Sequence, residues 1–312
     1  MTAADRPELQ QLLGPASGRY FAEGYREVRH DVHSIREFVP NTTTQFEAIA
    51  AVSYPPLWSV DRGGGTRTPH LSSVDAIVLP VLALQGSEHG DHQLERYWVR
   101  EITLRAGSEP WWDLAEVPIT MQLDASGSTL QLRAQSGNIR ANIVLESAEQ
   151  PGSPAASSSG VGASSYGEGF RRIHCETELT GFDAERNELS STHSFSAAEH
   201  PQERICVGIE SQHWPAVTII DYLVTMGQQV QALVYLAEHT NREQMGNLWM
   251  RTMRISRSAP PAALPLSTHT STSLIRRRLI KRSGATIHDL TVASRSHCAV
   301  TAEATVAYIE AV

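Results

Sequence analysis

Two apolar segments of similar layout constrain the fold of this chain more than any other feature of its sequence. Residues 69–85 read PHLSSVDAIVLPVLALQ and residues 214–231 read WPAVTIIDYLVTMGQQVQ. In each segment a Ser or Thr stands three residues before an Asp; the pairs are Ser72 with Asp75 and Thr218 with Asp221. Beyond the Asp, both segments are too apolar on all sides for a surface helix. We therefore expect two buried helices, each wrapped by a sheet.

The two segments belong to a longer internal repeat. Three matches keep the same order along the chain: Glu23–Val28 with Glu168–Ile173, Asp75 with Asp221, and Trp98–Arg100 with Trp249–Arg251, at offsets of 145, 146 and 151 residues. Three ordered matches at a nearly constant offset indicate duplication. Near the midpoint, residues 148–167 consist almost entirely of Pro, Ala, Ser and Gly, a composition typical of a flexible linker. We therefore predict domains at 1–147 and 168–312.

Alternating apolar and polar residues predict the strands around each helix. The pattern is found at 45–54 and most clearly at 97–106 in the first half, and strands are also expected at 117–123 and 130–146. The common unit is then two strands, a long buried helix, and three or four more strands. This order predicts an α+β protein with a tandem, or double, hot-dog fold, in which an antiparallel sheet wraps a central helix in each half. A cystatin-like arrangement of sheet and helix is the structural alternative.

Charge and composition restrict the class of partner. The 312 residues carry a formal net charge of −8, which disfavours binding to nucleic acid or to an anionic membrane surface. Three widely spaced cysteines, an N-terminus without a secretory pattern and the lack of a long uncharged apolar run predict a cytoplasmic protein. No phosphate-binding or dinucleotide-binding loop occurs, and the two His-x-x-His pairs lack further ligands, so we expect neither a cofactor nor a metal.

The clearest local arrangement for chemistry is His70 followed by Asp75. The first turn of the predicted helix offers unpaired backbone N–H groups that could polarise a thioester carbonyl, and Asp75 and His70 could transfer protons. The second half offers Asp221 with His213, eight residues earlier. Both Asp residues also fit the capping box, in which the acid only secures the start of the helix. The candidate catalytic residues are therefore His70, Asp75, His213 and Asp221, with capping as the alternative for each Asp.

Four further residues are candidates for binding substrate. Ser72 and Ser73 lie in the first turn of the helix, and Arg67 follows a run of three glycines that could approach an anionic group. Gln229 is a polar residue in a helix expected to be buried, although such a Gln more often satisfies a neighbouring backbone group. A basic run at 276–282 could attract an acidic carrier protein, or could protect an exposed strand from aggregation.

Several segments together resemble the avirulence D protein family of bacterial secondary metabolism. The resemblance is carried by Leu12–Pro15, Arg19–Phe21, Gly24-Tyr25, Pro69–Ala76 and the strand with Trp98 and Arg100. That family is associated with the synthesis of syringolide-like acyl glycosides from a β-ketoacyl precursor and a sugar. It looks related to the double hot-dog proteins of A-factor-type butenolide biosynthesis. Polyketide dehydratases, which are also double hot dogs, use a His from one half and an Asp from the other.

The resemblance implies an enzyme that acts on an acyl thioester, by acyl transfer with condensation or by dehydration. Its substrate would be carried by coenzyme A or an acyl carrier protein, and the chain could form a homodimer. The alternative is a non-catalytic hot-dog module that binds a small acyl or butenolide ligand. The His70–Asp75 spacing resembles the acid-bearing helix motif of the dehydratases but falls in the first half, so the half that supplies each group stays open.

Overall fold

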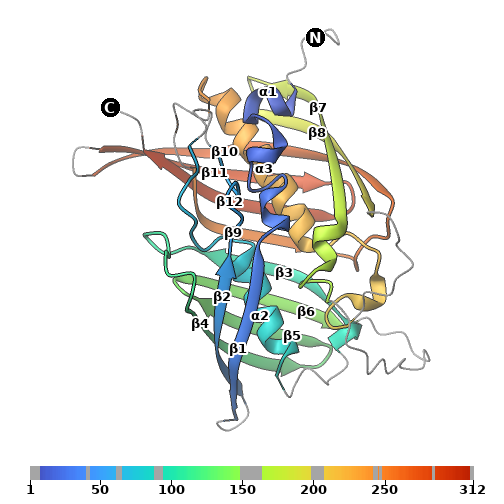
Figure 1. Ribbon diagram of the computed structural model, residues 1–312. Coiled ribbons are helices and arrows are strands. Elements are labelled where there is room, and N and C mark those ends of the chain that lie inside the picture. The colour runs from blue at the N-terminus through green and yellow to red at the C-terminus, as the bar shows by residue number, and fades with distance from the viewer. Residues whose placement is uncertain are drawn as a thin grey trace.

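A computed structural model describes most of the chain as one antiparallel sheet that curves around two helices (Figure 1). The described residues are 8–39, 43–60, 65–87, 94–147, 164–197, 207–241, 245, 248–282 and 285–309. Twelve strands in these ranges are ordered β1-β2-β4-β5-β6-β3-β9-β12-β11-β10-β8-β7. The predicted linker and His89-x-x-His92 lie outside the described residues, apart from positions 164–167, so the exact domain boundaries remain a prediction.

The first half contains six strands and the buried helix α2, preceded by a short helix α1. The bounds are α1 Leu9–Leu13, β1 Arg29–Phe38, β2 Thr44–Ser53, α2 Asp75–Gln85, β3 Tyr97–Arg105, β4 Val117–Ser126, β5 Thr129–Ser136 and β6 Ile139–Ser147. The expected strands are present, and α2 occupies the apolar part of segment 69–85. Residues 24–26 form a short 3-10 turn (η3) ahead of β1.

The second half repeats this order around the helix α3. The bounds are β7 Ile173–Asp183, β8 Glu188–Ala197, α3 Ile219–Ala237, β9 Trp249–Arg257, β10 Leu266–Arg282, β11 Ala285–Ser296 and β12 Val300–Ile309. A 3-10 turn, η6 (Gly169–Arg172), precedes β7 as η3 precedes β1. Each half is therefore a sheet around one helix, and the strand order of the whole reads the same from both ends when each strand is replaced by its counterpart. This is the predicted double hot-dog fold.

The register at the central strands shows that the halves are related by a pseudo-two-fold axis. In β3 and β9, Ile102 pairs with Ile255 and Leu104 pairs with Met253. At the offset of 151, Ile102 corresponds to Met253 and Leu104 to Ile255, so each pair maps onto the other. Both strands also skip one residue in their outer pairing, Arg100 in β3 and its counterpart Arg251 in β9. A β-bulge at the same place in both copies points to inheritance from a duplicated ancestor.

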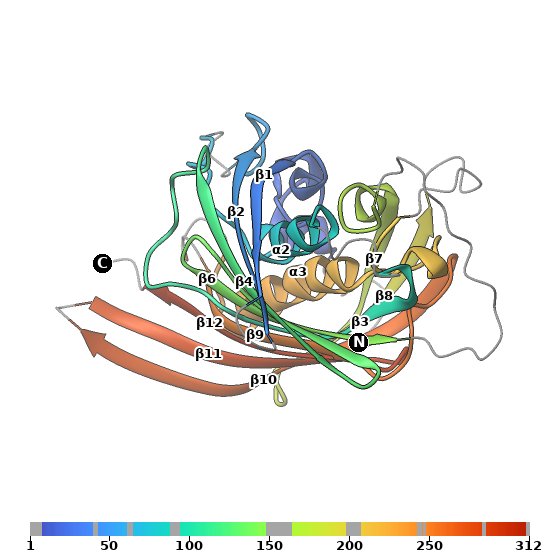
Figure 2. The ribbon, with the colours of Figure 1, turned by 90° about the horizontal axis from the view of Figure 1, so that it is seen from below.

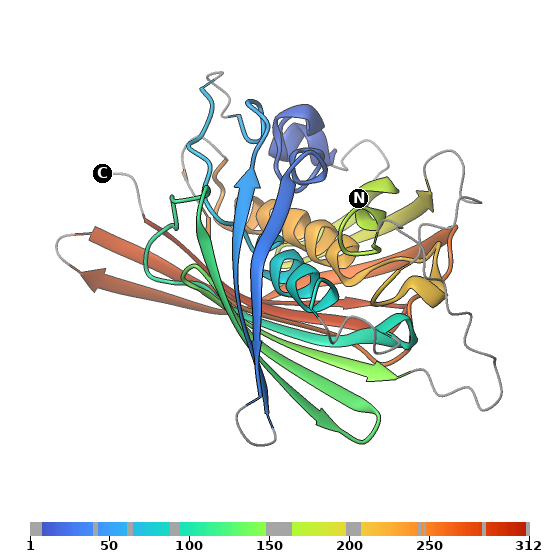
Figure 3. The ribbon, with the colours of Figure 1, turned by 60° about the horizontal axis from the view of Figure 1, so that its bottom comes forward.

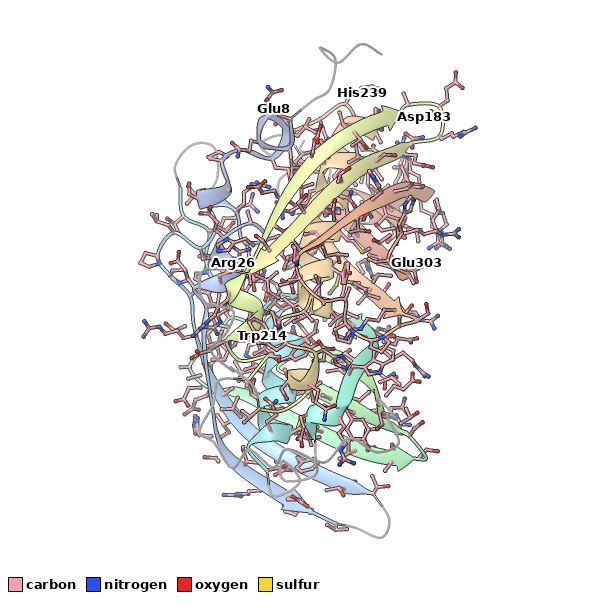
Figure 4. The ribbon with its side chains drawn as sticks, turned by 90° about the vertical axis from the view of Figure 1, so that its right-hand side faces the viewer. Glu8, Arg26, Asp183, Trp214, His239 and Glu303 are labelled. Atoms are coloured by element: carbon pink, nitrogen blue, oxygen red, sulfur yellow. The ribbon has the colours of Figure 1, made fainter. Side chains whose placement is uncertain are left out.

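The two turns before β1 and β7 exchange contacts across this axis. The rings of Tyr25 and Phe170 stack with centroids 6.0 Å apart. Arg26 donates from its guanidinium to the carbonyl oxygen of Ile173 at 2.6 Å, and Figure 4 shows it at the junction where the second half begins. Its counterpart Arg171 reaches back into the first half, where it contacts a histidine of β1 described below.

Both helices are buried, as their sequences predict. Figures 2 and 3 show α2 and α3 side by side on the same face of the curved sheet. In α2, nine of eleven residues are buried, including Asp75, because the helix is apolar on every side. Of the described helices, none has the length and hydropathy needed to cross a membrane.

Candidate functional site

A cavity of about 250 Å³ lies between the start of α2 and one face of α3. Its mouth is polar and aromatic; the residues there include Arg19, Tyr20, Trp58, Arg67, His70, Ser72, Ser73 and Trp111. Its inner part is mostly apolar; the residues there include Leu223, Met226, Val230, Tyr235, Met253, Val292, Ala304 and Val306. The first half therefore supplies most of the polar end, and the second half supplies most of the apolar wall.

His70 stands at the mouth of this cavity among aromatic rings. Its ring makes edge contacts with Trp58, Trp112 and Trp249, with centroids 5.6, 5.6 and 5.5 Å away. The Nδ1 atom lies 3.4 Å from the carbonyl oxygen of Thr68, which can only accept, so Nδ1 carries the proton and Nε2 keeps a free lone pair. Burial lowers the pKa of His70 from its ordinary value. A neutral imidazole with a free Nε2 is suited to act as a base.

Ser72 and Asp75 close the start of α2 with reciprocal hydrogen bonds. The Ser72 backbone N–H donates to Asp75 Oδ2 at 2.8 Å, and the Asp75 N–H donates to Ser72 Oγ at 3.2 Å. Ser72 Oγ also lies 2.5 Å from the Tyr20 hydroxyl oxygen in the cavity wall. Within the described chain, no acceptor takes the backbone N–H groups of Ser73 and Val74. Of the two, Ser73 lines the cavity, so the start of α2 offers it an unpaired donor together with the positive end of the helix dipole.

Asp75 has more partners than a helix cap requires. Besides Ser72, its carboxylate accepts a short hydrogen bond from the Tyr54 hydroxyl at Oδ2, and His30 Nε2 lies 2.7 Å from Oδ1. On the other side of the His30 ring, Nδ1 lies 3.1 Å from the guanidinium of Arg171. Because a guanidinium can only donate, Nδ1 is the acceptor and the His30 proton lies on Nε2, directed at Asp75. Three groups of the first half thus hold the Asp75 carboxylate: the Ser72 N–H, the Tyr54 hydroxyl and the His30 ring. Arg171 of the second half orients the His30 ring.

Asp75 stands behind the cavity wall, since its side chain is fully buried and is not among the cavity-lining residues. Its connection to the cavity runs through Ser72 and Tyr20. Burial and the neighbouring Asp75 raise the pKa of Tyr20 well above its ordinary value, so the phenol stays protonated. His70 and Asp75 therefore do not contact each other. His70 lines the cavity itself, whereas Asp75 is connected to the cavity through its hydrogen bond with Ser72.

Among the described residues, the counterpart of this network in the second half is a helix cap alone. The Thr218 N–H and hydroxyl both donate to Asp221 Oδ2, at 2.8 and 2.7 Å, and complete a capping box. The residue equivalent to His30 is Cys175, whose pKa is raised to about 12 mainly by burial. Such a thiol stays protonated and offers no charge to Asp221. Burial raises the pKa of Asp221 to about 7.

This raised pKa predicts a specific pH dependence of stability. Asp221 keeps its proton in the folded protein up to about pH 7, whereas the unfolded chain releases it near 3.8. The free energy of unfolding should therefore fall as the pH rises between these values, by up to about 4 kcal/mol for this one group. Asp221→Asn should lose that dependence while keeping an acceptor for the Thr218 N–H. Urea denaturation between pH 5 and 8 measures the free energy of unfolding at each pH. The same pH dependence of this free energy in the wild type and in Asp221→Asn would contradict the prediction.

The other predicted site residues of the second half lie away from the cavity. Gln229 is fully buried and bonds the hydroxyls of Ser191 and Thr272, so its predicted contact with substrate has no geometric support. Neither His213 nor Asp221 lines the cavity. The pKa of His213 is lowered by burial and by the nearby Arg257. These residues lie away from the cavity because the start of α3 is occupied by its own capping box and by packed core side chains.

The residues predicted in the first half lie together at the mouth. His70, Ser72, Ser73 and Arg67 all line the cavity. Gln228 lines it too, but its amide donates to the Phe21 carbonyl oxygen at 3.0 Å and accepts from Arg19 at 2.7 Å, which is the structural role expected for such a Gln. Trp249 of β9 also forms part of the wall, beside His70.

Four residues of the network could not be identified from sequence reasoning: Tyr20, His30, Tyr54 and Arg171. His30 stood out only as part of a His-x-x-His pair. The signal that could have identified it is the repeat itself, because its counterpart is a cysteine while the rest of the turn is retained. Within the described chain, no three His, Cys, Asp or Glu side chains gather as metal ligands. The expectation of no cofactor stays a prediction.

Comparison with solved structures finds hot-dog proteins at low similarity. One is a conserved protein of unknown function from Alicyclobacillus acidocaldarius with a hot dog fold, at 10% identity and a TM-score of 0.41, covering 89% of this chain and 96% of that one. Another is GphF Dehydratase 1, at 13% identity and a TM-score of 0.39, covering 88% and 97%. A third is a conserved hypothetical protein from Mycobacterium tuberculosis with a double hotdog fold, at 9% identity and a TM-score of 0.41, covering 78% and 83%.

At this level of similarity the neighbours say nothing about the reaction, and the fold assignment rests on the strand order and the enclosed helices. A search of curated proteins found no significant match. The family model described as Pseudomonas avirulence D protein (AvrD) matches residues 8–308, which is nearly the whole chain. The chain therefore belongs to the avirulence D protein family.

Proposed function

We propose that this protein is a biosynthetic enzyme of secondary metabolism that acts on a β-ketoacyl or related acyl thioester, by acyl transfer with condensation or by dehydration. One observation carries the proposal. A single cavity joins a helix start with unpaired N–H donors and a neutral histidine to a long apolar wall. A thioester needs both ends of such a cavity, because its carbonyl is polar and its chain is not.

The apolar wall fits the acyl chain of the substrate. The lining residues of α3 form one stripe from Leu223 to Tyr235, which at 1.5 Å per residue is about 18 Å long. An apolar cavity of about 150 Å³ already holds benzene, so the 250 Å³ found here accommodates a chain of several more carbons. Burying each methylene contributes about 0.8 kcal/mol, which makes the chain the main source of affinity.

The start of α2 would bind the carbonyl oxygen of the thioester. The N–H group of Ser73 and the helix dipole favour the negative charge that develops on this oxygen. His70 Nε2 would take a proton from the carbon beside the carbonyl, and the electron pair of the broken C–H bond would move onto the carbonyl oxygen as an enolate. The enolate can then attack an acceptor carbonyl, with later loss of water, or expel a β-hydroxyl group.

Ser72 and Tyr20 would supply the proton that the second stage needs, since both residues line the cavity and their hydroxyl groups share a hydrogen bond. Asp75 would be a positioning residue: its carboxylate fixes Ser72 and is itself fixed by His30 and Tyr54. A ligand-binding module without catalysis is the second candidate, and the placement of Asp75 behind the wall favours it.

A panel of β-ketoacyl and β-hydroxyacyl thioesters, followed by mass spectrometry, tests the proposal. Wild-type protein should convert at least one member in the presence of a suitable acceptor, and His70→Ala should lower the rate by about 100-fold or more. The matched control is His297→Ala, a change at an exposed histidine of β11–β12 that should leave the rate unchanged. Binding of the thioesters without conversion would support the ligand-binding module.

A further inference from the structure

The hairpin of β10 and β11 extends beyond the body of the molecule as an arm, here defined as residues 275–282 and 285–288. Strand β8 pairs with β10 only from Leu266 to Ser273, so the edge of β10 beyond that point has no partner strand among the described residues. Every residue from 275 to 281 is exposed, on both faces of the strand. Figure 2 shows β10 and β11 reaching past the other strands on one side. Proteins normally avoid a long exposed strand edge because it can pair with other chains, so the exposed edge of β10 suggests a binding partner.

One face of the arm combines an apolar row with arginines. The register pairs Ile280 with Ile287 and Ile287 with Ile309, which places the three side chains in a row across β10, β11 and β12. Ile280 and Ile309 are 37% and 60% exposed. Arg276 and Arg278 lie on the same face as Ile280, since alternate residues of a strand share a face. An apolar centre with a charged rim is the composition of a protein-binding surface.

The charges of the arm select the kind of partner. Arg276, Arg278 and Lys281 form no ion pair with any described residue, whereas Arg277 on the other face binds Glu238 at the end of α3. Asp289, the acid in register with Arg278, is buried. These cations stand on a chain whose net charge is −8. Pairing the arms of two copies edge to edge would place arginines against arginines, which is unfavourable. The complementary partner is an acidic protein.

The arm begins at the wall of the cavity. Leu274, the last residue before it, pairs with Val292 of β11, and Val292 lines the apolar part of the cavity. Figures 1 and 3 show the arm on the same side of the molecule as the loop between β3 and β4, whose Pro110 and Trp111 line the mouth. The arm is therefore continuous with the strands that form the apolar wall of the cavity.

We propose that the arm docks an acidic acyl carrier protein, which presents the thioester on its phosphopantetheine group. This rests on the proposed function for the identity of the cargo, while the docking itself rests on the charge and the exposure of the arm. Hydrophobic contacts between the row of isoleucines and apolar residues of the carrier would add affinity. The arginines would speed association and make the binding depend on the salt concentration.

Binding of purified bacterial acyl carrier protein, loaded with a β-ketoacyl chain, tests the proposal by fluorescence anisotropy at several salt concentrations. The double variant Arg276→Glu/Arg278→Glu should weaken binding by about tenfold or more and remove most of the salt dependence. The matched control is Arg36→Glu/Arg186→Glu, which reverses two exposed cations on β1 and on the β7–β8 turn and should bind as the wild type does. Circular dichroism confirms that both variants are folded.

Turnover of the same acyl group on N-acetylcysteamine separates the docking from the reaction. Both variants should convert this small thioester at the wild-type rate. If it is converted but carrier binding ignores the arm, or weakens equally in both variants, the docking proposal is overturned and the reaction stands. If nothing is converted but binding depends on the arm, the docking stands and the proposed reaction fails. A wild-type dimer that the arm variant makes monomeric would assign the arm to self-association and overturn the carrier protein.

Discussion

Asp75→Asn is expected to lower thioester turnover by about 100-fold, whereas Asp221→Asn should change it less than about threefold. The two residues are counterparts in the duplicated fold, and both are buried at the start of a helix. They differ in their partners: Asp75 binds Tyr54 and His30 in addition to Ser72, while Asp221 binds only Thr218 among the partners described. The chain thus supplies its own matched control.

The physical reason lies in the donors around Asp75. If the Asn oxygen keeps the contacts with Ser72 and Tyr54, its NH₂ group faces the Nε2–H of His30, a donor against a donor. His30 cannot relieve this by moving its proton to Nδ1, because that atom faces the guanidinium of Arg171. The network around Ser72 must therefore rearrange, and with it the start of α2.

A pH–rate profile distinguishes this positioning role from a loss of stability alone. Asp75→Asn should reduce kcat more than it raises KM, and the profile of the remaining activity should still rise through the depressed pKa of His70. Equal turnover in the two Asn variants, both shown to be folded, would refute the assignment of the site to the first half.

Arg257→Met should lower the free energy of unfolding by about 3–5 kcal/mol, a larger effect on stability than we expect from the other substitutions proposed. The Arg257 guanidinium makes a short ion pair with Glu210, and it donates to the backbone oxygens of Val99 at 2.7 Å and Val217 at 3.3 Å. Both charged side chains are 2% exposed. Val99 belongs to β3 of the first half, and its backbone bonds both members of the ion pair, so these hydrogen bonds join the two halves. Loss of the guanidinium leaves the buried Glu210 without its cation, held among the described residues only by the Val99 N–H and the Tyr166 hydroxyl, and takes the donor from two carbonyl groups.

Urea denaturation measures this effect, and Arg254→Met is the matched control. Arg254 crosses the same seam to Glu101 at 2.8 Å, but its side chain is 64% exposed, so its loss should cost less than about 1 kcal/mol. The double variant Arg257→Met/Glu210→Met should be less destabilised than the single one, since it leaves no buried acid unpaired. Burial raises the pKa of Glu210, so the single variant should recover part of its stability as the acid is protonated at lower pH. Equal losses for Arg257→Met and Arg254→Met would contradict this account.

The sequence allowed much of the fold to be predicted, for local reasons. Helix burial follows from apolar residues on every side, strands follow from alternation, and the repeat offsets anticipated the equivalence of β3 and β9. The capping pairs of α2 and α3 were also visible, because a cap joins residues only three positions apart.

What the sequence by itself determined is a duplicated chain with two buried helices, each begun by an acid. What only the tertiary structure decided is which acid has further partners and where a ligand can fit. Asp75 and His30 are 45 residues apart, and Arg171 comes from the other half, so no local pattern could place them together. The cavity likewise uses the helix start of one half and the helix face of the other. Such a site exists only once the sheet has curved both halves around their shared axis.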